Sequence, residues 1–119
     1  MGSDGRYCVV CTTCGARKEA ERIAEAVVVE RLGACVQIEA VTSCYRWEGA
    51  LHREPEWRLT IKTRSALYSS LRDRIAALHS YTVPEIVRMP LAGGSAAYLA
   101  WIDETTGALG ERSRGARRR

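Results

Sequence analysis

The 119-residue chain contains no phenylalanine and no asparagine. Its aromatic side chains are therefore three tryptophans and five tyrosines, whose polar atoms usually need a hydrogen-bond partner or an interface when they are covered. No apolar run is long enough to span a membrane, and the early segment from Tyr7 to Cys11 is too short for a secretion signal. With 46% hydrophobic residues, the composition favours one globular domain with aromatic residues at subunit contacts.

The net charge of +4 comes from one end of the chain. Residues 107–119 contain five arginines and one glutamate, whereas residues 1–106 hold 13 basic and 13 acidic side chains. A neutral domain argues against specific nucleic-acid binding. We expect a folded domain over residues 1–106 and a disordered basic tail over residues 107–119, which would bind polyanions only loosely.

The chain has five cysteines, an odd number, and no visible export signal, a combination that favours reduced thiols in the cytoplasm. Three of them, Cys8, Cys11 and Cys14, follow a C-x-x-C-x-x-C spacing that is also found in iron-sulfur and zinc sites. Side chains three apart on a strand point to opposite faces, so such a cluster is not expected. We expect Cys8 in the core, Cys11 half-buried near a strand end and Cys14 as a loop thiol, with a Cys11–Cys14 pair left open.

Apolar periodicity predicts the order β-α-β-β-α-β-α. The strands are expected at residues 6–13, 35–47, 51–63 and 86–91, and the helices at 16–32, 65–78 and after 95. Ser65 and Ser95 are the expected helix caps, and Gly33 is expected to end the first helix. Glu48 and Gly49 predict a hairpin tip, and Pro55 indicates a bulge or an edge position.

Right-handed crossovers around a central hairpin fold this order into a ferredoxin-like α+β sandwich, an antiparallel sheet covered by two helices, with a short helix at the C-terminal end. The expected strand order is 4-1-3-2. Because the first and fourth strands are then antiparallel neighbours, the end of the first strand, with Cys11, can approach the start of the fourth.

A polar connection precedes that fourth strand and carries His79, Tyr81 and Glu85, with Pro84 holding the preceding residue extended. A neutral imidazole suits copper, zinc or nickel. The alternative is that His79 only ends a helix favourably, through its interaction with the helix dipole.

Several short segments stand in a fixed order along the chain: Thr12, then 30–36 (ERLGACV), 45–49 (YRWEG), 61–63 (IKT), 79–86 (HSYTVPEI) and 98–101 (YLAW). Taken together, they resemble one family, the CutA proteins, which are implicated in divalent-cation tolerance. The resemblance covers roughly residues 7–104. It implies a homotrimer, similar in architecture to the PII signalling proteins, with clefts between subunits.

The resemblance also implies a copper site, which falls by position on Cys11 and His79. A second histidine of some members corresponds to Leu78, and the chain departs from the family pattern at Gly33, Ser80 and Cys14. The function expected from the resemblance is that of a trimeric, CutA-type tolerance protein that binds copper or related metal ions. The alternative is a PII-like signalling or scaffolding trimer that binds a small ligand or a protein partner in its clefts.

Five further residues are cleft candidates: Cys35, Trp47, Lys62, Tyr81 and Glu85. Cys35 can equally be a small core residue, the two aromatic residues can pack between subunits, and Lys62 and Glu85 can form a surface ion pair. The sequence shows no catalytic triad, phosphate-binding loop or paired-carboxylate motif, and the absence of asparagine excludes acylphosphatase-type catalysis in its usual form. We therefore expect no enzymatic activity.

Overall fold

The computed structural model describes residues 5–107. Its elements in chain order are β1 (Tyr7–Cys14), α1 (Arg17–Val29), β2 (Cys35–Trp47), β3 (Ala50–Arg64), the 3-10 turn η1 (Ser65–Leu67), α2 (Tyr68–Leu78), β4 (Val87–Pro90) and α3 (Ala96–Thr105). The basic tail predicted for residues 107–119 lies, apart from Gly107, outside the described residues.

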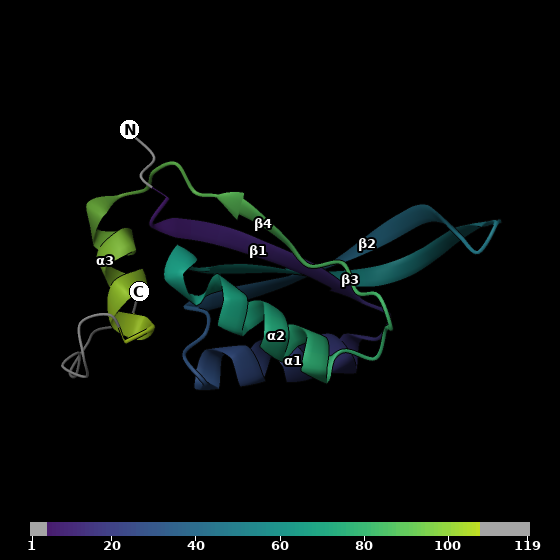
Figure 1. The fold of residues 1–119 in the computed structure, drawn as a ribbon, viewed down its shortest axis with the longest axis horizontal. Coiled ribbons are helices and arrows are strands. Elements are labelled where there is room, and N and C mark those ends of the chain that lie inside the picture. The colour runs from purple at the N-terminus through teal and green to yellow at the C-terminus, as the bar shows by residue number, and fades with distance from the viewer. Residues whose placement is uncertain (1–4, 108–119) are drawn as a thin grey trace.

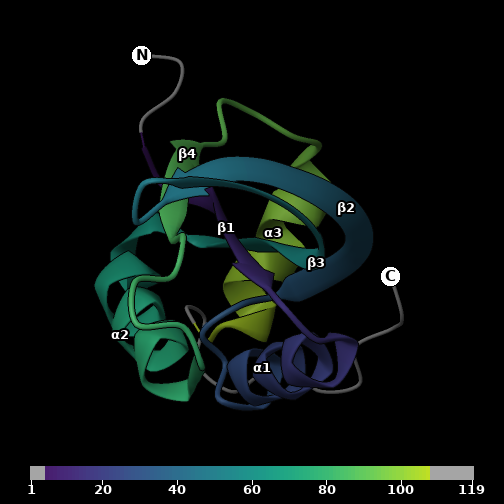
Figure 2. The ribbon, with the colours of Figure 1, turned by 90° about the vertical axis from the view of Figure 1, so that its right-hand side faces the viewer.

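The four strands form one antiparallel sheet in the order β2-β3-β1-β4. Helices α1 and α2 cover the same face of this sheet, and α3 packs at one end of it (Figures 1 and 2). The predicted ferredoxin-like α+β architecture and strand order are therefore confirmed. The first and fourth strands are neighbours, with Cys11 opposite Val87.

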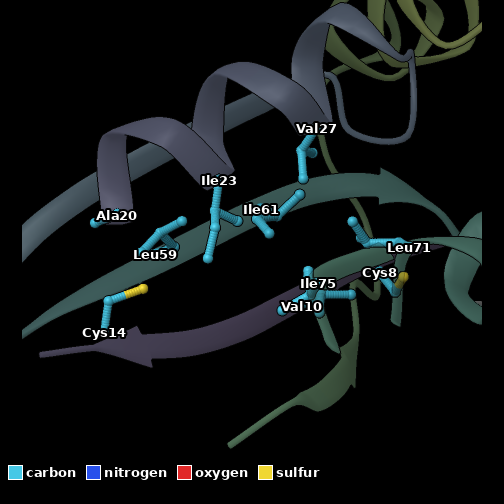
Figure 3. Packing of buried hydrophobic residues seen from close by; sticks show 10 residues of the cluster. All are labelled: Cys8, Val10, Cys14, Ala20, Ile23, Val27, Leu59, Ile61, Leu71 and Ile75. Atoms are coloured by element: carbon cyan, nitrogen blue, oxygen red, sulfur yellow. The ribbon is translucent and has the colours of Figure 1, made fainter. Parts of the chain in front are cut away.

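The hydrophobic core is built from one face of the sheet and from the two helices that cover it, and Figure 3 shows its buried residues. Helix α1 presents Ala20, Ile23 and Val27 to it at the predicted helical spacing, because every third or fourth residue returns to the same face. The other members of the buried cluster come from β1, β3 and α2: Cys8, Val10, Cys14, Leu59, Ile61, Leu71 and Ile75. The predicted core position of Cys8 is correct.

Strands β2 and β3 form a long hairpin that extends beyond the helices (Figure 1). Its tip has Glu48 at φ 51° and Gly49 at φ 80°, two consecutive left-handed residues as in the tight turns that join twisted strands. Pro55 of β3 pairs with Thr42 of β2 in an unbroken register. On its other side β3 pairs with β1 only as far as Trp57, so Pro55 lies beyond the last residue of β3 that has a β1 partner. Pro55 is therefore at an edge position, and there is no bulge.

The ends of the helices differ from the prediction at two places. Helix α1 ends at Val29, and the left-handed residue after it is Arg31 (φ 62°), whose N–H donates to Val28 O while Leu32 N–H reaches back to Val27 O. Gly33 therefore does not end the helix. A Cβ at Gly33 would lie 2.7 Å from Val27 Cγ1 and from Ile61 Cγ2, so this glycine allows the backbone to approach the core.

The predicted serine caps also differ in outcome. Ser65 opens the turn η1, and no side-chain hydrogen bond caps α2. Ser95 caps α3 as predicted, because its Oγ accepts a hydrogen bond from Tyr98 N at 3.2 Å.

Candidate functional site

His79 follows the last residue of α2, and its side chain is fully buried against the end of β1. Its Nε2 lies 2.8 Å from the carbonyl oxygen of Thr13, and its Nδ1 lies 3.2 Å from the backbone nitrogen of Tyr81. A carbonyl only accepts and a backbone N–H only donates, so the proton is on Nε2 and Nδ1 carries the lone pair. The ring is thus fixed in orientation by two backbone contacts.

Cys14 is the last residue of β1 and is fully buried in the core. The prediction of a loop thiol was wrong, because β1 continues to Cys14, where it still pairs with Trp57. Its Sγ lies 3.9 Å from His79 Nε2. Burial, followed by the carboxylates of Glu19 and Glu56, raises the pKa of the Cys14 thiol to about 12, so without a metal the group is protonated at neutral pH.

Glu19, in the first turn of α1, brings a carboxylate to the same place. Its two oxygens accept hydrogen bonds from Ser80, from the backbone N–H at 2.7 Å and from the hydroxyl at 3.0 Å. Oε2 also lies 3.6 Å from His79 Nδ1. Cys14, Glu19 and His79 therefore each offer one ligand atom, and these three atoms lie within 4.8 Å of one another.

Sequence patterns do not single out Glu19, which belongs to the charged face of an amphipathic helix. It is buried because the connection after α2 folds over the start of α1, and this contact between segments about 60 residues apart leaves no local signal. Cys14 did carry a signal, as a departure from the CutA pattern in a C-x-x-C-x-x-C series.

Tyr81 and Glu56 form the adjoining part of the site. The Tyr81 hydroxyl donates to Glu56 Oε2 at 2.5 Å, and burial together with this hydrogen bond raises the pKa of Tyr81. A Cβ at Gly15 would lie 2.9 Å from the Tyr81 oxygen, so the glycine after β1 makes room for the ring. Tyr81 thus connects the polar segment after α2 to strand β3.

Cys11, the thiol expected beside His79, lies three residues before Cys14 on β1 and is 8% exposed. Alternation along a strand points the two side chains to opposite faces of the sheet. Cys14 faces the helices with Cys8 and Val10, and Cys11 faces the other way. Among residues 5–107, the structure brings His79 together with Cys14 and not with Cys11.

The cleft candidates do not form one group. Tyr81 and Glu85 lie near the end of β1, where Glu85 is 3.5 Å from the hydroxyl of Thr13. Cys35 and Lys62 are paired across β2 and β3, and the Lys62 ammonium donates to Gln37, so its observed partner is neutral. Trp47 stands apart at the far end of β2, next to the hairpin tip.

The donor set around His79 matches a particular class of ion. Thiolate and imidazole are soft or borderline ligands that prefer zinc and copper, whereas magnesium and calcium prefer sites made of oxygen atoms alone. With a cysteine, a histidine and a single carboxylate within 4.8 Å, the residues fit copper or zinc.

Comparisons with known proteins agree with this architecture. A family model described as CutA1 divalent ion tolerance protein matches residues 8–105. The Thermus thermophilus divalent-cation tolerance protein CutA is 46% identical over 100 residues, which cover 83% of this chain and 97% of that protein.

Solved structures of the same family superpose closely. The periplasmic divalent cation tolerance protein CutA from Archaeoglobus fulgidus has a TM-score of 0.83 at 38% identity, with 84% of this chain and 98% of that chain covered. CutA from Synechococcus elongatus has a TM-score of 0.84 at 32% identity, with 87% and 93% covered. The chain therefore belongs to the CutA1 family of divalent ion tolerance proteins.

Proposed function

We propose that this protein is a homotrimeric divalent-cation tolerance protein that binds copper or a related heavy-metal ion and has no enzymatic activity. The observation that carries the proposal is a fully buried histidine, His79, held in orientation by two backbone contacts in a chain of the CutA1 family. A neutral imidazole is a ligand that suits copper and related ions. Cys14 lies beside His79, but its raised pKa keeps the thiol protonated, and a thiol is a much poorer nucleophile than a thiolate.

The ligands proposed from the family resemblance are Cys11 and His79. Two protein ligands bind a metal less tightly than the usual three or four, so we expect modest copper affinity. Isothermal titration of the reduced, chelator-treated full chain with Cu(II), and with Cu(I) under anaerobic conditions, measures it. Cys11→Ser and His79→Ala should each weaken binding, while Cys44→Ser, at an exposed cysteine, serves as the matched control. Absence of copper binding by the wild-type chain would contradict the proposal.

The trimer is supported by apolar side chains left exposed in the single chain. Trp47 is 47% exposed and Leu51 is 73% exposed, both next to the tip of the projecting hairpin, and Val87 and Met89 are exposed on the edge strand β4. Large exposed apolar groups on an extended hairpin favour association with further copies of the chain. Light scattering of the full chain should give three times the 13.2 kDa chain mass. A monomeric mass at micromolar concentration would contradict it.

The second candidate is a PII-like trimer that binds a small ligand or a protein partner between its subunits. It is favoured by the hydrogen bond between Tyr81 and the buried Glu56, two polar side chains outside the proposed ligand pair. Titration with common nucleotides in the same buffer separates the two candidates: nucleotide binding without copper binding would favour the PII-like function.

For the location of the protein we propose the cytoplasm, because its five cysteines are all unpaired. In residues 5–107, no helix is long and apolar enough to cross a membrane. Related proteins differ in this respect, since one from Arabidopsis thaliana is described as chloroplastic.

A further inference from the structure

We infer that Cys14, Glu19 and His79 form a binding site for a zinc-type divalent cation, separate from Cys11. The inference rests on the proposed metal-binding function, to which it adds a ligand set and a class of ion. The three residues come from the end of β1, the first turn of α1 and the segment after α2 (Figure 1). Three separate parts of the fold therefore converge on one point.

The spacing of the ligand atoms suits a small ion. Four-coordinate zinc, with bonds of about 2.0–2.3 Å, holds its ligand atoms about 3.3–3.8 Å apart. Glu19 Oε2 and His79 Nδ1 are 3.6 Å apart, and Cys14 Sγ lies 3.9 Å from the other ring nitrogen of His79. The three ligand atoms lie within 4.8 Å of one another, and a fourth position around the ion would be left for water or a substrate group.

The imidazole is already oriented as in metal sites. A metal-bound histidine usually donates its other ring N–H to a carbonyl or a carboxylate, which fixes the tautomer and directs the lone pair at the ion. His79 donates from Nε2 to Thr13 O, and Nδ1, which carries the lone pair, lies 3.6 Å from Glu19 Oε2. On binding, Nδ1 would exchange its 3.2 Å contact with the Tyr81 N–H for a bond to the ion.

The charges around the thiol favour a cation as well. Glu19 and Glu56 both act on Cys14 with negative charge, and Arg22 opposes them only partly. A divalent cation bound here would form a bond to sulfur as the S–H bond breaks and its proton passes to solvent, and it would offset the nearby carboxylates. Glu19 stays in place through its two hydrogen bonds from Ser80, so the carboxylate ligand is preorganised.

Cobalt(II), a spectroscopic substitute for zinc, tests the site in the reduced, metal-free full chain. The wild-type protein should show sulfur-to-cobalt charge-transfer absorption that stoichiometric zinc removes. Cys14→Ser and Cys14→Ala should lack this band and bind zinc at least about tenfold more weakly in competition titrations. Glu19→Gln should retain the band and bind zinc more weakly, because the amide keeps the shape of the side chain and loses its charge.

Cys44→Ser, at an exposed cysteine, is the matched control and should behave as wild type. Cys11→Ser, which changes a thiol on the opposite face of the sheet from Cys14, should keep the cobalt band. Circular dichroism and the melting temperature of each metal-free variant show that it is folded. The inference is overturned if Cys14→Ala is folded and keeps the band, if Cys11→Ser loses it, or if the wild-type chain shows no band. A parallel copper titration distinguishes failure of this inference from failure of the proposed metal-binding function. Copper binding without a cobalt band would overturn only the inference. Binding of neither metal would overturn both.

Discussion

Gly33 lies where the chain leaves α1 and meets the core, next to two branched side chains. Since a Cβ there would lie 2.7 Å from atoms of Val27 and Ile61, Gly33→Ala has to push both side chains aside. We expect the free energy of unfolding to fall by about 1–3 kcal/mol, the usual cost of overpacking. Urea unfolding measures the change. Gly93→Ala is the control, because a Cβ at Gly93 would have no atom within 4 Å, and an equally stable Gly33→Ala would contradict the packing argument.

The buried thiols predict a loss of stability at alkaline pH. Burial raises the pKa of Cys8, and it raises that of Cys14 to about 12, from 9.0 for a free thiol. Above about pH 9 the unfolded chain loses these protons while the folded chain keeps them, so unfolding releases protons and the free energy of unfolding falls as pH rises. For Cys14 alone the loss at about pH 10.5 is at most about 2 kcal/mol.

Urea unfolding of the metal-free protein at about pH 8 and about pH 10.5 measures this dependence. Cys14→Ala should make it shallower, although a methyl group in a space shaped for a thiol also lowers stability at both values. Cys44→Ala changes an exposed cysteine and should leave the slope unchanged. The same slope in all three proteins would show that Cys14 does not contribute.

For single residues, the sequence predicted fewer members of the site than of the hydrophobic core. His79 was predicted as a ligand candidate because histidine is rare in the chain and stands in a rigid polar connection. Cys14 was assigned to a loop, since the glycine that follows it suggested an earlier strand end. Glu19 and Glu56 carried no indication of burial, because a carboxylate becomes buried only through contacts that distant segments make in the folded chain.

At the level of elements, α3 depends on a single side-chain cap. Ser95 Oγ accepts from Tyr98 N, and replacing such a cap by alanine costs about 1 kcal/mol. We expect Ser95→Ala to lower the melting temperature, with hydrogen exchange in α3 accelerated most. Ser70→Ala, at an exposed position inside α2, is the control and should not be destabilising, because alanine is the better helix former. Equal protection of α3 in both variants would argue against the cap.

The order, type and pairing of the elements could be predicted because they follow from apolar periodicity, crossover handedness and turn residues. The ends of the elements could not all be predicted in this way. Arg31 takes the left-handed position after α1. Gly33, two residues later, is needed instead for close packing against the core. Ser65 enters a 3-10 turn, in which its backbone carbonyl, and not its hydroxyl, is used to start α2.

For the whole molecule, the projecting hairpin predicts which residues hold the proposed trimer together. Trp47→Ser combined with Leu51→Ser removes the apolar side chains that flank the hairpin tip, and we expect the molar mass in light scattering to shift toward the monomer. Val29→Ser is the control, because Val29 is equally apolar and 78% exposed but lies at the end of α1. Dissociation by the control, or an intact trimer in the double variant, would contradict this assignment.

The hydrogen bond from Tyr81 to Glu56 has a consequence for thermodynamic linkage. Glu56 pairs with Val41 in the hairpin, while Tyr81 is two residues from His79, so one contact connects the hairpin that carries the proposed assembly surface to the proposed metal site. If trimer formation shifts this contact, it also changes the affinity for metal. Metal binding must then change the equilibrium constant of trimerisation in turn, because linkage is reciprocal. Tyr81→Phe, which keeps the ring and removes only the hydroxyl, should uncouple the two equilibria while leaving each of them measurable.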